Sequence, residues 1–121
     1  MREQLIDFET AKLAKEKGFD WKTVYYYDFI GFLSSGNSAQ HWNGSKESIY
    51  STPTQSLLQK WLRERPTPII VTPEYDFIAW VVWVDDPDKD RIFIDKVDGK
   101  WINKYEDSLE IGLYQALKLI K

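Results

Sequence analysis

The sequence predicts an α+β protein, in which a small, mostly antiparallel sheet has about three helices packed on it, in the order α-β-α-β-β-α. Three segments place apolar residues at the three- and four-residue spacing of a helix with one buried face. The segments between them are rich in Val, Ile, Tyr and Trp, which favour strands. Because the 121 residues contain no linker and no repeat, we expect residues 1–121 to form a single globular domain.

The first helix is expected over residues 8–17. Asp7 stands where its side chain can cap the first turn, and Gly18 can end the helix in a left-handed conformation. Phe19 is then placed to fold back on the last turn.

The next two segments differ in polarity. Residues 21–33 are apolar at both odd and even positions, which predicts one strand, or two strands broken at Gly31, covered on both faces. Residues 34–51 are mainly polar. Within them Asn43 and Gly44 favour a hairpin turn, and a mobile loop is the alternative.

A second helix follows this polar segment. Thr52 is expected to cap it, with Pro53 in the first turn and Gln55 completing a capping box. Prolines at 66 and 68 end it. The expected buried stripe consists of Leu57, Leu58, Trp61 and Leu62.

Strands are expected over residues 69–72 and 76–84. The second has no polar face, so we place it at the centre of the sheet. A polar turn over 85–90 leads into a returning strand over 91–97, with both isoleucines on one face, which should pair with the preceding strand as a hairpin. Asp98-Gly99 then forms another turn.

The last helix is strongly amphipathic. Asn103 and Glu106 are expected to form its capping box. Its buried stripe is expected to contain Leu109, Leu113, Ala116, Leu117 and Ile120.

Composition limits the chemistry. The chain has no cysteine, which excludes disulfides, thiolate metal ligands and cysteine nucleophiles. His41 is the only histidine, which excludes most catalytic triads and any site that needs two imidazoles. The sequence also lacks the glycine-rich phosphate loops and the common hydrolase patterns. We therefore expect no cofactor and no catalytic residues, and we favour a non-enzymatic protein.

Four aspartates follow the expected central strand: Asp85, Asp86, Asp88 and Asp90. Their alternation is similar to the start of a calcium loop, but Arg91 stands at the sixth position and Val97 at the twelfth, where Gly and Glu are required. A solvated hairpin turn is the simpler interpretation, so we expect no metal site here.

Charge and hydropathy bear on the compartment and the partners. The net charge of −3 does not favour binding to a phosphate backbone. The first nine residues lack the apolar core of a signal peptide, and no apolar run approaches the roughly 20 residues of a membrane helix. We expect a cytoplasmic protein without membrane contact.

Two functional hypotheses remain. Trp21, Trp42 and Trp101 lie near turn-rich segments where a ring can stay partly exposed, and His41 precedes Trp42. These four residues form the candidate interaction surface for an unknown protein partner. A second copy of the chain is one such partner. The alternative is a single-stranded nucleic-acid binder that stacks bases on sheet aromatics, namely Tyr25, Tyr27, Trp80 and Trp83. The simpler role of these four rings is core packing.

Three strings resemble a family of small, uncharacterised phage and prophage proteins carried by gut bacteria. They span residues 9–20, 53–64 and 105–120, and their order and spacing match. The resemblance implies phage or mobile-element origin and cytoplasmic production, and it implies no catalytic residues. It also favours a role in binding a host or phage protein.

Overall fold

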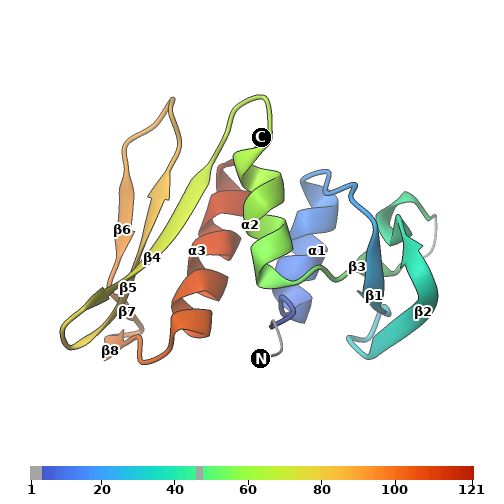
Figure 1. Ribbon diagram of the computed structural model, residues 1–121, viewed down its shortest axis with the longest axis horizontal. Coiled ribbons are helices and arrows are strands. Elements are labelled where there is room, and N and C mark those ends of the chain that lie inside the picture. Colours follow the sequence, from blue (N-terminus) through green and yellow to red (C-terminus); the bar gives the residue numbers. More distant parts are fainter. Residues whose placement is uncertain (1–3, 46–47) are drawn as a thin grey trace.

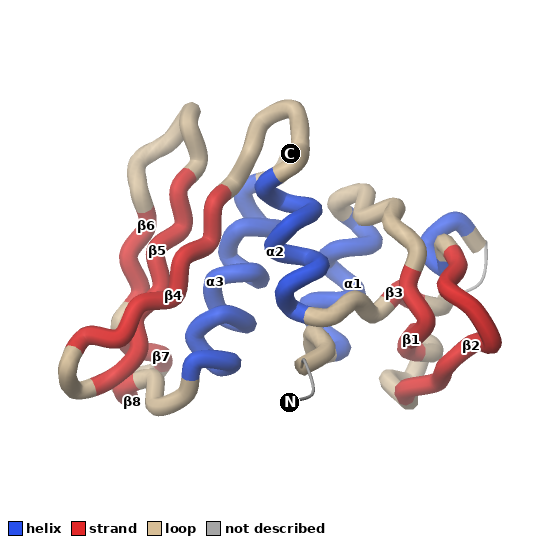
Figure 2. Tube along the Cα trace, in the orientation of Figure 1, coloured by secondary structure: helices blue, strands red, loops and turns tan. Residues whose placement is uncertain are grey.

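A layer of helices lies between two small sheets. The computed structural model describes residues 4–45 and 48–121, and within these it contains three α-helices, two three-stranded sheets and a short hairpin (Figures 1 and 2). All strand pairs are antiparallel. The predicted α+β class is confirmed, with the strands divided between the two sides of the helices.

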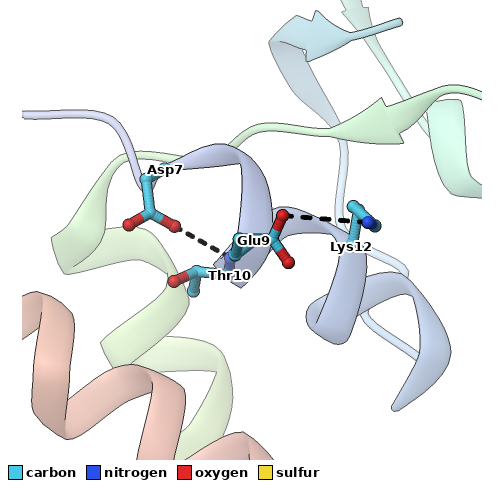
Figure 3. Close-up of polar contacts among 4 residues, drawn as sticks. All are labelled: Asp7, Glu9, Thr10 and Lys12. Carbon is cyan, nitrogen blue, oxygen red and sulfur yellow. Dashed lines mark hydrogen bonds and ion pairs between the residues drawn. The ribbon is translucent and has the colours of Figure 1, made fainter. Parts of the chain in front are cut away.

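The first helix, α1, spans Phe8–Glu16 and has the predicted boundaries within one residue. Asp7 Oδ1 accepts a hydrogen bond of 2.9 Å from the backbone N–H of Thr10, which confirms the predicted cap (Figure 3). Gly18 has a φ of +95°, and Phe19 beyond it is buried, as the sequence indicates.

The second helix, α2, spans Gln55–Arg63 and begins later than predicted. Thr54 is the N-cap, and its side chain accepts a hydrogen bond from a first-turn N–H. Thr52 is instead buried, and its N–H donates to the carbonyl of Tyr25 in the neighbouring sheet. The predicted cap at Thr52 and the capping box at Gln55 were therefore wrong. Leu58, Trp61 and Leu62 are buried as predicted, and Leu57 is half-buried.

The third helix, α3, spans Tyr105–Leu119. Its N-cap is Lys104 without a side-chain hydrogen bond, so the predicted cap at Asn103 and Glu106 was wrong. The predicted stripe is confirmed, because each of its members is buried: Leu109, Leu113, Ala116, Leu117 and Ile120.

The first sheet has the strand order β4-β5-β6 and packs on α3 (Figure 1). Its strands are β4 (Ile70–Asp76), β5 (Ala79–Asp85) and β6 (Ile92–Ile94). The central position of β5 confirms the prediction. Ile92 pairs with Val84 and Ile94 with Val82, so both isoleucines share one face as expected. Beyond β6, the hairpin of β7 (Lys96–Val97) and β8 (Lys100–Trp101) turns at Asp98-Gly99.

The second sheet has the order β2-β1-β3 and lies on the α1 side of the helices (Figure 1). Its strands are β1 (Thr23–Tyr27), β2 (Leu33–Gln40) and β3 (Tyr50–Ser51). A single 3-10 turn, η1 (Trp42–Gly44), follows β2. Residues 46 and 47 of the predicted polar segment lie outside the described residues.

Two predictions for this sheet were wrong. No hairpin forms about Asn43 and Gly44, because β1 lies between β2 and β3. The apolar run over residues 21–33 is broken at Gly31 as expected, but it is not covered on both faces. Its middle part is a turn, and this turn points its large side chains to solvent.

Candidate functional site

A cluster of exposed apolar side chains marks the turn between β1 and β2. The exposed fractions are 70% for Phe29, 58% for Ile30, 66% for Phe32 and 48% for Leu33. We call these four residues the β1–β2 tip. Single exposed apolar residues are common on protein surfaces, but here four occur within five consecutive positions, three in the turn and Leu33 at the start of β2.

The backbone of the tip is held in one shape by Asp28. Asp28 Oδ1 accepts hydrogen bonds from the N–H groups of Ile30 at 3.0 Å and Phe32 at 2.9 Å. The backbone adds a bond from Asp28 N to the carbonyl of Phe32 and one from Gly31 N to the carbonyl of Asp28. This is the local bonding by which Asp stabilises a turn. Hydrogen bonds therefore fix the backbone of the turn that carries the exposed apolar side chains.

Gly31 anchors the turn to the helical layer. Its φ is +96°, and a Cβ at this position would lie 3.2 Å from Cδ2 of Phe8 on α1. The Phe8 ring also makes edge contacts with Tyr27 on β1 and Tyr50 on β3. The tip thus rests on an aromatic cluster that joins α1 to the sheet.

The stretch of chain that begins at the tip carries no charged residue. In a chain with 29% charged residues, residues 29–45 contain no Asp, Glu, Lys or Arg. They include the tip, all of β2 and η1. A charge-free stretch of this length is unusual for an exposed strand, since exposed edges commonly carry charge.

A second apolar tip lies between β4 and β5. Phe77 is 92% exposed and Ile78 75% exposed. Tyr75 on β4 is 58% exposed beside them, and its hydroxyl donates to the carbonyl of Phe77. The carboxylates of Glu74 and Asp76 flank this turn. It therefore exposes large side chains at three positions, against four in the β1–β2 tip, and two carboxylates flank it.

Hollows beside α3 contain a partly buried carboxylate. Two of them, of about 430 and 370 Å³, share Val97, Glu110 and Ile111 in their walls. Burial raises the pKa of Glu110 above its ordinary value, and hydrogen bonds to the carboxylate oppose this rise only in part. Gln55 Nε2 donates to Oε1 at 3.0 Å, and the N–H of Asp7 donates to Oε2 at 3.1 Å. These bonds join α3 to the starts of α2 and α1, which is a structural role.

The predicted candidates Trp21, His41 and Trp42 lie near the second sheet. Trp42 Nε1 donates to the carbonyl of Thr23 at 2.7 Å, and its ring lies 4.4 Å from the ring of Tyr26. Trp21 is half-buried and packs against the core. His41 is exposed at the start of η1. Trp42 and Trp21 thus have packing partners within the chain.

Trp101, the fourth candidate, lies apart from the other three. It is 48% exposed on β8, with Lys96 Nζ 4.2 Å from its ring centroid. The β7–β8 hairpin and the β1–β2 pair occupy opposite ends of the molecule (Figure 1). The structure therefore does not bring all four predicted residues into one surface.

The aromatics considered for nucleic-acid stacking are also divided. Tyr25 and Tyr27 belong to β1, whereas Trp80 and Trp83 belong to β5 on the other side of the helices. One face of Trp83 already carries the guanidinium of Arg91, 3.9 Å from the ring centroid. These rings form no common stacking platform.

The aspartates after β5 form a turn. Asp86 Oδ1 accepts from the N–H of Asp88 at 2.9 Å, and Asp85 pairs with Arg91 at 2.8 Å. Among the residues that the structure describes, no group of three or more His, Asp or Glu side chains is placed to hold a metal ion.

Three comparisons with known proteins find no match. No protein-family model, no curated protein and no solved structure matches this chain. None of the described helices has the length and apolar character to cross a membrane.

The β1–β2 tip was missed by the sequence analysis. Continuous apolar character over residues 21–33 predicts one strand, or two strands broken at Gly31, covered on both faces. The available signal was the pair Asp28 and Gly31, whose residue types and spacing are typical of a turn. Giving this pair more weight than the apolar run would have placed Phe29, Ile30 and Phe32 on a turn.

Proposed function

We propose that the protein is non-enzymatic and acts by binding another protein through the β1–β2 tip. The observation that carries this proposal is a turn, fixed by Asp28, that exposes Phe29, Ile30, Phe32 and Leu33 together. Exposing these groups to water is unfavourable, and a partner that covers them removes this cost. Aromatic side chains at the centre of a contact surface commonly dominate binding energy.

The size of the tip supports this role. Its four residues together expose about 500 Å², backbone included, taking roughly 200 Å² for a fully exposed residue of this size. Patches of about 300–600 Å² are the largest on a typical monomer and are often functional. The tip is therefore in the range of a partner-binding patch.

The charge pattern favours a protein partner over nucleic acid. Affinity for a phosphate backbone comes mainly from Lys and Arg, and residues 29–45 contain neither. The nucleic-acid alternative stays a prediction that the divided positions of Tyr25 and Trp83 do not support. The phage or prophage origin and the cytoplasmic location also stay predictions, and a binding role is consistent with both.

Affinity capture from the host cell lysate tests the proposal. The tagged wild-type protein is compared with a Phe29→Ser/Phe32→Ser variant. Both side chains are exposed, so we expect the free energy of unfolding to change by less than about 0.5 kcal/mol. We expect the variant to lose the captured partner.

The second apolar tip provides a matched control. A Phe77→Ser/Ile78→Ser variant removes two exposed apolar side chains of similar size elsewhere. We expect it to retain the partner. Equal capture by all three proteins, or loss only in the Phe77 and Ile78 variant, would overturn the proposal.

A further inference from the structure

Asn43 joins three segments of the chain, although its sequence context favours a hairpin turn. It lies in η1, and its side-chain Nδ2 donates at 3.0 Å to the carbonyl of Phe19, which follows α1. Its Oδ1 accepts from the N–H of Ser51 on β3 at 2.8 Å, and its own N–H donates to Ser51 Oγ at 3.1 Å. We call these three hydrogen bonds the Asn43 clamp. One residue thus ties η1 to the end of α1 and to β3.

The residue that follows makes this side-chain amide chemically reactive. Gly44 has no side chain, so its backbone nitrogen can approach Cγ of Asn43 with little hindrance. Once this nitrogen has lost its proton, its attack forms an N–Cγ bond, and the bond from Cγ to Nδ2 breaks. Nδ2 gains a proton and leaves as ammonia. The cyclic imide then takes up one water molecule and opens to aspartate or isoaspartate, so water is the only co-reactant.

The fold holds the nucleophile, the leaving group and the carbonyl oxygen of this reaction. The N–H of Gly44 donates to the carbonyl of His41 at 3.1 Å, and both polar atoms of the Asn43 amide belong to the clamp. Their partners, Phe19 and Ser51, lie in other segments of the chain. Turning the amide toward Gly44 therefore breaks both of its bonds, and the reaction requires η1 to open first.

Trp42 stabilises the closed position of η1. Its Nε1 donates to the carbonyl of Thr23 at 2.7 Å, and its ring centroid lies 4.4 Å from that of Tyr26 on β1. A Cβ on Gly36 of β2 would lie 2.6 Å from Trp42 Cζ2. Opening of η1 thus disturbs contacts with both β1 and β2.

We propose that Asn43 is a site of spontaneous deamidation, which the closed fold suppresses and which, once it occurs, releases η1 from the end of α1. A carboxylate at position 43 has no N–H to donate, so it faces the carbonyl oxygen of Phe19 with a negative charge. Isoaspartate also lengthens the backbone before Gly44 by one carbon atom. Either product introduces a charge into residues 29–45, which otherwise carry none.

Peptide mapping by mass spectrometry tests the suppression. The purified wild-type protein is incubated at a mildly alkaline pH, either folded or unfolded in urea. We expect Asn43 to deamidate about tenfold more slowly, or slower still, in the folded protein, because opening breaks at least two hydrogen bonds. Equal rates in the two samples would overturn the proposal.

The variant Ser51→Ala tests whether the clamp sets the rate. It removes the acceptor of the Asn43 N–H and leaves the reacting Asn43-Gly44 pair unchanged. When opening is fast, the rate follows the population of the open form, so we expect deamidation about threefold faster in the folded variant and unchanged in urea. Ser35→Ala, at an exposed position of β2, should react like the wild type.

A second variant covers the case in which Ser51→Ala does not fold. Trp42→Phe removes the Nε1 donor to Thr23 and keeps an aromatic ring against Tyr26. It should also react faster than the wild type when folded and at the same rate in urea. Wild-type rates in both folded variants would overturn the role of the clamp.

The release of η1 is tested with a variant that has the product side chain from the start. Asn43→Asp should lower the melting temperature by about 4 °C, because it loses the hydrogen bond to Phe19 and adds a repulsive contact. Asn37→Asp adds the same charge at an exposed position of β2 and should change it by less than about 2 °C. Equal melting temperatures of the two variants would overturn the release of η1.

Discussion

The ring of Phe8 lies directly against the backbone of Gly31, so that a Cβ on Gly31 would lie 3.2 Å from Phe8 Cδ2. This contact joins the first helix to the turn that carries the β1–β2 tip. Because the same ring also contacts Tyr27 and Tyr50, the position of the tip depends on the packing of α1 against the sheet.

Gly31→Ala should disturb this contact. Gly31 and Gly18 both have positive φ, so alanine at either position should cost about 1–2 kcal/mol of unfolding free energy. A Cβ at Gly18 meets nothing within 4 Å, whereas one at Gly31 meets Phe8. Gly31→Ala should therefore be the more destabilising of the two in urea unfolding. Equal effects would show that the Phe8 contact contributes nothing.

Gly112→Ala should destabilise the protein although alanine is the better helix former. A Cβ on Gly112 would lie 2.5 Å from Val82 Cγ2 and 2.7 Å from Val71 Cγ1. Overpacking of this kind costs about 1–3 kcal/mol of unfolding free energy. Replacing glycine by alanine in a helix gains about 1 kcal/mol. Because two side chains are approached this closely, we expect a cost in the upper part of the overpacking range, which exceeds the gain. In a Val82→Ala background the cost should fall by about 1 kcal/mol. Additive effects in this double-mutant cycle would contradict the close approach of α3 to the sheet.

Thr54→Ala should cost about 1 kcal/mol, because the Thr54 side chain caps α2. Asn103→Ala should change the stability by less than about 0.5 kcal/mol, since Asn103 is exposed and makes no cap bond to α3. Thermal unfolding of the two variants compares the observed cap at Thr54 with the position at Asn103 where the sequence predicts a cap. A larger loss from Asn103→Ala would favour the cap predicted from the sequence.

Glu110 should make the protein less stable as the pH rises. Burial raises the folded-state pKa of Glu110 above its unfolded value. The folded protein then holds this proton more tightly than the unfolded chain, so the unfolding free energy falls as the pH rises from below the ordinary value through the raised pKa.

The variant Glu110→Gln isolates this contribution. Urea unfolding of both proteins should show the wild type gaining stability relative to the variant as the pH is lowered through this range. A difference between the two proteins that does not vary with pH would show that the pKa of Glu110 is not raised.

The helices and the central strand could be predicted because their signals are local. Asp7 with Gly18 delimits α1, and the apolar spacing from Leu109 to Ile120 defines the buried face of α3. The start of α2 could not be fixed, since Thr52 and Thr54 are both able to cap it. The choice depends on Tyr25, which receives a hydrogen bond from Thr52 across the sheet. Contacts between distant segments of this kind leave no periodic signal in the sequence.

The candidate site was harder to predict than the fold. Tryptophan content and turn-rich context pointed to Trp21, Trp42 and Trp101, and the structure gives the first two packing partners within the chain. An apolar run indicates burial only where the chain continues through it as a regular strand or helix. At Asp28 the chain turns instead, and this exposes the residues that hydrophobicity alone assigns to the core.

Site-specific photo-crosslinking tests the role of the β1–β2 tip most directly. A photoreactive amino acid replaces Ile30 in the tip or, as a control, Asp98 in the β7–β8 turn, and each protein is irradiated both purified and in a cell lysate. We predict a specific protein adduct from position 30 and none from position 98. The absence of any adduct from position 30 in both samples would contradict the proposal that the tip binds a protein.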